Sequence, residues 1–180
     1  MQQRQNTTET FHEEQQFRQP WVWLPLLIIT IGLIGMFVYG LYVQLYLGHP
    51  WGDRPMSDSG LLITAILSSL LMGGTVWLFY VLKLITRVDA GGVYVRFFPL
   101  TRKRIPFENI ISCQARTYRP IREYGGWGIR FSRKGMAYNV HGNEGVQLTF
   151  KQGKPLLIGS QRPEQLAAAI NNHLSQPASG

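Results

Sequence analysis

The sequence predicts an α+β membrane protein, in which a two-helix transmembrane hairpin precedes an antiparallel β-barrel or sandwich that a C-terminal helix closes. Two nearly uncharged stretches, residues 21–47 and 61–85, each exceed the roughly 20 residues that cross a bilayer as a helix. Between residues 86 and 160, many short runs alternate apolar with polar residues, which predicts strands. After residue 160 the apolar spacing becomes that of a helix.

The N-terminal segment, residues 1–20, is polar and rich in glutamine. Thr10 and Glu13 have the spacing of a capping box, in which each of the two residues caps the first turn of a helix. Glu14 and Arg18 are four residues apart, which gives weak support to the same helix. We expect a short cytoplasmic helix that ends at Pro20. We expect residues 1–8 to be disordered.

The two apolar stretches read as membrane spans. Residues 21–47 contain no charged residue, and Lys83 is the only one in residues 61–85. The first stretch is too long for the apolar core of a signal peptide, and no small-residue cleavage site follows it. We predict two transmembrane helices, with residues 48–60 as the loop between them. No ionisable residue lies deep in either span, which argues against an ion or proton pathway.

The distribution of charge predicts the orientation of the hairpin. The connecting loop holds Arg54 against Asp53 and Asp58. Because Lys and Arg near the span ends favour the cytoplasmic side, we expect both termini in the cytoplasm and residues 48–60 outside the cell membrane. Six basic residues carry this signal after the second span: Lys83, Arg87, Arg96, Arg102, Lys103 and Arg104.

Small residues in the two spans suggest how the helices pack. Ala65, Ser69 and Gly73 recur every four residues, and Gly32 and Gly35 lie in the first span. Small residues let helices approach closely where lipid supplies no hydrophobic drive. We expect these residues to pair the two helices. The alternative is that the stripe faces a second copy of the chain or another protein.

Residues 86–175 predict a cytoplasmic domain of about seven or eight short strands with one apolar face. Turn signals occur at residues 89–92 and 151–154. Pro163 suits the first turn of a helix, and Leu166 and Ile170 repeat at helical spacing after it. That helix is expected to cover an open end of the sheet. We expect residues 176–180 to be a disordered tail.

The glycine-rich stretch 124–146, "YGGWGIRFSRKGMAYNVHGNEGV", resembles a phosphate-binding loop only in composition. A dinucleotide-binding loop needs a helix directly after its glycines, and here the next helical pattern begins near residue 160. We interpret these glycines as turns and bulges of the sheet.

Cys113 is the only cysteine and is expected to be a buried core residue. We predict no metal, no cofactor and no catalytic residue.

The second half of the chain is strongly basic. Residues 87–180 contain 14 Lys and Arg but 5 Asp and Glu. Anionic lipid attracts each basic side chain near its surface by about 1 kcal/mol; the alternative is that these charges are only solvated. Nucleic acid is an unlikely partner because no recognition motif accompanies the charge. The candidate surface for lipid or a protein partner comprises Arg102, Lys103, Arg104, Arg116, Arg119, Arg122, Arg130, Arg133 and Lys134.

Several segments carry a resemblance to a known group of proteins: "RVDAGGVYVRF", "IPFENI", "GGWGIRF", "GMAYNVHGNEGVQL" and "LLIGSQRPEQLAAAI". Over roughly residues 10–174 the chain resembles an uncharacterised family of small bacterial two-transmembrane proteins with a cytoplasmic PH-like domain. The resemblance implies a PH-like fold and names no catalytic residue. PH domains that bind phosphoinositides carry basic residues between their first two strands, whereas residues 89–92 here contain an acid and no base.

Three functions follow as hypotheses. The first is a membrane-anchored binding or scaffold module that recruits or stabilises a protein partner at the inner face of the membrane. The second is recognition of anionic lipid by the basic loops. The third, which we favour least because no catalytic cluster can be read from the sequence, is an enzyme acting on a membrane-associated substrate. The groups available to an enzyme are Glu108, Glu123, Tyr138, His141 and Glu144.

Overall fold

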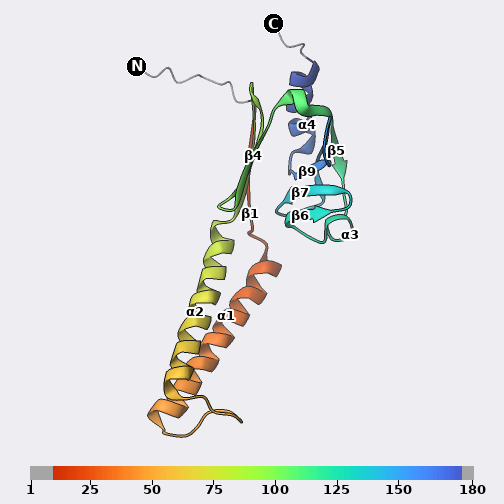
Figure 1. Cartoon of the computed structure of the whole chain (residues 1–180). Helices are drawn as coiled ribbons and strands as arrows, with labels where there is room; N and C mark the ends of the chain where they lie inside the picture. The colour runs from red at the N-terminus through yellow and green to blue at the C-terminus, as the bar shows by residue number, and fades with distance from the viewer. Residues whose placement is uncertain (1–9, 176–180) are drawn as a thin grey trace, which may run out of the picture. The chain divides into compact units, whose positions relative to one another are not determined.

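The computed structural model describes residues 10–175, which form two compact units. A helical hairpin runs from Arg18 to Val81, and the segments before and after it together form a sheet domain. Figure 1 shows these elements along the chain. The predicted disorder of residues 1–8 and 176–180 lies outside the described residues.

The hairpin consists of α1 (Pro20–Leu41), which continues as the π-helical turn η1 (Tyr42–Tyr46), and α2 (Asp58–Val81). Both helices are long and apolar enough to cross a membrane. The predicted second span is too long at its C-terminal end, since the chain turns from helix to strand at Lys83. The reason is that the β-branched residues Ile85, Thr86 and Val88 are buried and the whole segment pairs with another strand.

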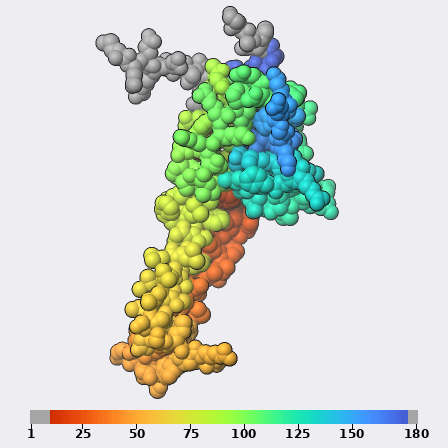
Figure 2. Space-filling model, in the orientation of Figure 1, coloured from red at the N-terminus to blue at the C-terminus, as the bar shows by residue number. Residues whose placement is uncertain are grey.

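The contact between α1 and α2 agrees with the predicted one at Ala65 and differs from it at the glycines. Phe37 and Leu61 pack with Ala65 in its buried core, and Figure 2 shows the two helices (orange and yellow) in contact. A Cβ atom built on Gly32, Gly35 or Gly73 meets no other atom within 4 Å. The predicted close approach at these three glycines is therefore not what holds the hairpin together, because large side chains make the contact instead.

The remaining small residues of the hairpin have different roles. Ser69 is half-buried and lines an apolar groove between α1 and α2. A Cβ atom on Gly40 would lie 2.6 Å from the ring of Trp51, so this glycine makes room for the indole. Gly40, which the sequence did not single out, is thus the position where a helix comes close to a bulky neighbour.

Sheet A has four antiparallel strands in the order β1-β2-β3-β4. They are β1 (Phe11–Gln16), β2 (Lys83–Asp89), β3 (Gly92–Phe98) and β4 (Thr101–Ile105). The short N-terminal helix was a wrong prediction, because β1 occupies that segment. Phe11, Glu13 and Gln15 are buried while the residues between them are more exposed, a period of two that fits a strand on the edge of β2.

Sheet B has five strands in the order β5-β8-β9-β7-β6. They are β5 (Ile110–Thr117), β6 (Gly128–Ser132), β7 (Gly135–Asn139), β8 (Glu144–Phe150) and β9 (Leu156–Gly159). The 3₁₀ turn η2 (Phe107–Asn109) and the helix α3 (Pro120–Tyr124) flank β5. The strands form two sheets, so of the two predicted alternatives, barrel or sandwich, the closed barrel is not formed. The parallel pairing of β7 with β9 departs from the predicted antiparallel arrangement.

The core of the sheet domain lies where the two sheets and the last helix meet. Helix α4 (Pro163–Ser175) buries Leu166 and Ile170 completely and packs against β5 and β8, as predicted for a closing helix. Figure 2 shows α4 (blue) beside the green segment around η2 and β5. The ring of Phe97 lies 6.5 Å from that of Tyr138, which joins sheet A to sheet B.

Strand β1 is also tied to the far side of the domain. The side-chain amide of Gln15 donates to the carbonyl of Gly159 over 2.9 Å, and the hydroxyl of Ser160 donates to the carboxylate of Glu13. The amide of Gln161 donates to the same carboxylate. The predicted domain boundary at residue 86 is therefore too late, because the domain needs β1 and the whole of β2.

Candidate interaction surface

The nine basic residues predicted as a surface do not form one patch. One group surrounds Glu123: its carboxylate receives hydrogen bonds from the guanidinium of Arg116 at 2.7 Å and from the amide of Arg119 at 2.7 Å. The ammonium of Lys134 lies 3.4 Å from it. Arg116 and Lys134 are therefore neutralised within the domain.

The surroundings of Glu123 change its acidity. Burial alone would raise the pKa of this carboxyl, but the hydrogen bonds from the Arg119 backbone amide and the Arg116 guanidinium, together with the positive charges of Arg116 and Lys134, outweigh burial and lower the pKa to about 2. The carboxylate therefore stays ionised at any physiological pH. It fixes α3 to β5, which is a structural role rather than one in ligand binding.

The glycine-rich stretch builds the turn before β6, as predicted. Gly125 ends α3 with a φ of 74°, a conformation that favours glycine. The indole N–H of Trp127 donates to the carbonyl of Gly142 over 2.9 Å, and Arg130 donates back to the carbonyl of Trp127 over 2.7 Å. Arg130 thus stabilises the turn. Arg122 and Arg133 are exposed, on α3 and on the β6–β7 turn.

A second group of basic residues lies on the outer face of sheet A. The register places Arg87 beside Tyr94 and Arg104, and Ile85 beside Arg96 and Arg102. Alternate side chains of a strand share a face, so Lys83 lies on the same face of β2 as Ile85 and Arg87. We call this surface the basic face: Lys83, Arg87, Arg96, Arg102 and Arg104.

The basic face is only partly neutralised. Lys83 pairs with Glu14 at 3.1 Å and Arg104 with Asp89 at 3.5 Å, and both pairs are open to solvent. Arg96 lies over the ring of Phe98, 4.7 Å from its centre. Exposed ion pairs contribute little to stability and leave their charges available to a partner.

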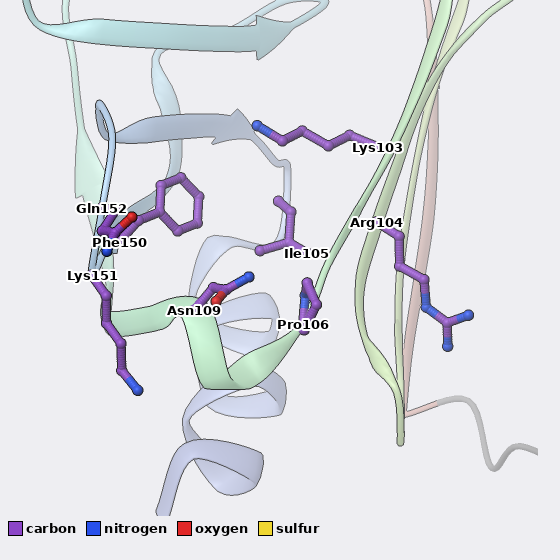
Figure 3. Close-up of a pocket in the computed structure, with 8 residues that line it drawn as sticks. All are labelled: Lys103, Arg104, Ile105, Pro106, Asn109, Phe150, Lys151 and Gln152. Atoms are coloured by element: carbon purple, nitrogen blue, oxygen red, sulfur yellow. The ribbon is translucent and has the colours of Figure 1, made fainter.

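A cleft with a volume of about 410 Å³ lies beside β4. Residues 103–106, Asn109 and residues 150–152 line it, and we call it the β4 cleft. In Figure 3, Lys103 extends toward Phe150 across the cleft, while Arg104 points to the other face of sheet A. The ammonium of Lys103 lies 5.8 Å from the centre of the Phe150 ring. None of the lining residues is acidic.

The residues that could serve an enzyme lie in different environments. Glu108 is exposed on η2, Glu123 is ion-paired, and burial raises the pKa of Tyr138. His141 and Glu144 share a hollow of about 250 Å³.

Two further observations concern reactive and metal-binding groups. Burial raises the pKa of Cys113 to about 12, which makes its thiol a poor nucleophile. Within residues 10–175 no group of three His, Cys, Asp or Glu side chains could hold a metal ion.

Sequence reasoning missed Phe150 and Lys151 as parts of a site. The turn at residues 151–154 was predicted, but its position beside β4 depends on how the two sheets meet. The basic face was missed for a similar reason: Lys83, Arg87 and Arg96 were interpreted as signals of membrane orientation alone. Their alternation in β2 and β3 is the signal that could have revealed a shared face.

Comparison with known proteins identifies the family of the chain without assigning an activity. No curated protein matches the sequence. The sequence model of DUF6141, a family of unknown function, matches residues 2–176. The match covers nearly the whole chain, which therefore belongs to the DUF6141 family.

Proposed function

We propose that the chain is a membrane-anchored binding module that recruits or stabilises a protein partner at the inner face of the cell membrane. The anchor is the helical hairpin, whose outward side chains are apolar along both helices. Leu24 and Leu71, for example, are 64% and 71% exposed. Water would oppose exposure on this scale, whereas a bilayer accommodates it.

The pairing of β1 with β2 supports the predicted topology. These strands directly precede α1 and directly follow α2 in the chain, and they pair along their whole length. If both helices span the membrane, paired strands must lie on one side of it. The cluster of basic residues after α2 favours the cytoplasm as that side. Two sheets and a closing helix also support a PH-like domain of the kind found in small bacterial membrane proteins.

The observation that carries the proposed function is the β4 cleft. Lys103 on β4 and Lys151 on the opposite wall both line it, and neither has a carboxylate within 4.0 Å among residues 10–175. A concave surface with two uncompensated cations and the apolar side chains of Phe150 and Ile105 is complementary to an acidic protein partner. The enzyme candidates, in contrast, do not converge on this cleft.

Purification of the full-length protein from native membranes tests the proposal. We expect wild type to retain a specific partner, and Lys103→Glu combined with Lys151→Glu to weaken retention about tenfold or more, since each reversal opposes an acidic surface. The matched control is Arg122→Glu combined with Arg133→Glu, which changes charge equally but away from the cleft. No specific partner on wild type, or equal losses in both variants, would contradict the proposal.

Anionic lipid is the second candidate, and the basic face favours it. Lys83 follows the last residue of α2 by two positions, and Arg96 and Arg102 lie in the neighbouring row of the sheet. Clusters of four to eight basic residues next to a membrane helix attract anionic lipid. If this candidate is right, wild type purified from native membranes retains anionic lipid but no specific protein. The double variant Arg96→Glu with Arg102→Glu then loses that lipid.

A further inference from the structure

Strand β4 is an edge of sheet A, so one row of its backbone groups has no partner strand among residues 10–175. The β2–β3 hairpin closes on Asp89 and Gly92 with two residues between them. In such a hairpin the closing pair is hydrogen-bonded, and the pattern then alternates along each strand. In β3 the residues with odd numbers, 93 to 97, therefore form their backbone hydrogen bonds with residues 105, 103 and 101 of β4. The amides and carbonyls of Arg102 and Arg104 consequently point toward the open edge.

The β4 cleft follows this open edge. Its wall includes the consecutive residues 103–106. Neighbouring side chains of a strand point to opposite faces, so consecutive residues can share one cleft only if it runs beside the backbone itself. Figure 3 agrees, since Lys103 and Arg104 leave β4 in opposite directions on either side of the edge.

The chemistry of the edge is basic on both faces. Arg102 and Arg104 belong to the outer face, and Lys103 lies on the inner one, opposite Phe150, while Lys151 lines another part of the same cleft. A strand added beside β4 would place successive side chains alternately against these two faces. Acidic residues at consecutive positions would therefore each meet a cation, and a flanking apolar side chain would meet Phe150.

The same charges argue against other occupants. A second copy pairing through β4 would set Arg and Lys against Arg and Lys, which is unfavourable. Basic residues on an edge strand also protect a protein from indiscriminate strand pairing. The same basic side chains attract a strand that carries acidic residues.

We propose that the open edge of β4 binds an extended acidic segment of a protein partner, which joins sheet A as a fifth strand. This inference rests on the proposed function and adds the chemistry of the partner and its mode of binding. Backbone hydrogen bonds to Arg102 and Arg104 supply affinity, and the cations on both faces select carboxylates.

The test measures binding of a fluorescent peptide, acetyl-Gly-Glu-Glu-Val-Glu-Glu-Gly, to the full-length protein in nanodiscs of neutral lipid. Arg104→Ala and Arg104→Pro lose the same charge, but only proline removes the edge amide. Proline is tolerated on an open edge, and circular dichroism checks the fold. We expect the alanine variant to bind about threefold more weakly than wild type and the proline variant about tenfold more weakly again.

A second measurement does not depend on the folding of a variant. Two isomers of the peptide, N-methylated at either the odd or the even amides, keep every charge but block opposite edges of the strand. We expect one isomer to bind much more weakly than the other.

Either of two results would overturn the inference. The first is equal binding of both isomers and of both Arg104 variants. The second is displacement of the peptide by inorganic phosphate, or by vesicles of anionic lipid, at matched charge and ionic strength. If wild type still retains a protein from native membranes, the proposed function survives either result and only the added strand is lost.

Discussion

Glu123 shows how a single residue of the sheet domain can join several elements, because its partners are close in sequence but lie on different elements. Its carboxylate joins Arg116 on β5, the start of α3 and Lys134 on the β6–β7 turn. Sequence reasoning placed these cations on a binding surface because composition shows charge but not pairing. Lys103 and Arg102 were predicted in the same way, and for them the structure leaves the charge unpaired by any acid within residues 10–175.

Replacing Glu123 by glutamine tests its structural role. We expect Glu123→Gln to lower the free energy of unfolding of the sheet domain by about 2 kcal/mol at neutral pH, as for hydrogen bonds to a charged group. Because the pKa of the folded carboxyl is lowered from 4.5 to about 2, the stabilisation is complete above pH 4.5 and is lost as the pH falls toward 2.

Thermal melting of both proteins in nanodiscs at several pH values measures this difference. Arg122→Gln, an exposed neighbour on α3, is the control and should melt like wild type throughout. A gap between Glu123→Gln and wild type that stays constant from pH 7 to pH 2.5 would contradict the account.

Strand β1 is the element for which sequence and structure disagree most. The capping-box residues Thr10 and Glu13 predict a helix, but the segment forms a strand in which Phe11, Glu13 and Gln15 are buried on one face. The deciding partners lie about seventy residues further on in β2, and no local pattern reveals a pairing over that separation. The end of α2 was misplaced for the same reason, because Leu84 and Ile85 suit an apolar helix as well as a strand, and pairing with β1 and β3 decides for the strand.

Other elements could be predicted with fair accuracy. The two apolar helices, the β2–β3 turn and α4 follow from composition and period alone. The division of the strands into two sheets and the parallel β7–β9 pair could not be predicted, since they depend on chain crossings that the alternation of apolar residues does not encode.

The contribution of β1 can be measured by removing one of its contacts. Gln15→Val deletes the donor to the carbonyl of Gly159 in a buried setting. We expect a loss of about 1–2 kcal/mol in the stability of the sheet domain. Gln16→Val, one position along and less buried, serves as the matched control. Limited proteolysis in nanodiscs should cleave Gln15→Val at lower temperature than the control, and equal resistance would show that β1 is not part of the folded domain.

At the scale of the whole molecule, the chain combines an apolar hairpin with a domain assembled from both of its flanks. This arrangement links β1 and β2 to the two ends of the hairpin through short connections, residues 17–19 and Leu82. Such a domain cannot be isolated by cutting the chain after α2, because β1 would be left behind. Binding experiments therefore require the full-length protein.

The most direct test of the account is photo-crosslinking in intact cells from a single benzophenone side chain. Placed at Gln152, it lies at the β4 cleft; placed at Asn143, it lies on the exposed turn before β8 and serves as control. The account predicts a discrete protein adduct from position 152 that is weak or absent from 143. The adduct should resist protease added outside the cells and disappear with Lys103→Glu. Lipid adducts alone at position 152, or equal protein adducts from both positions, would contradict the claim that this cleft recruits a protein at the inner face of the membrane.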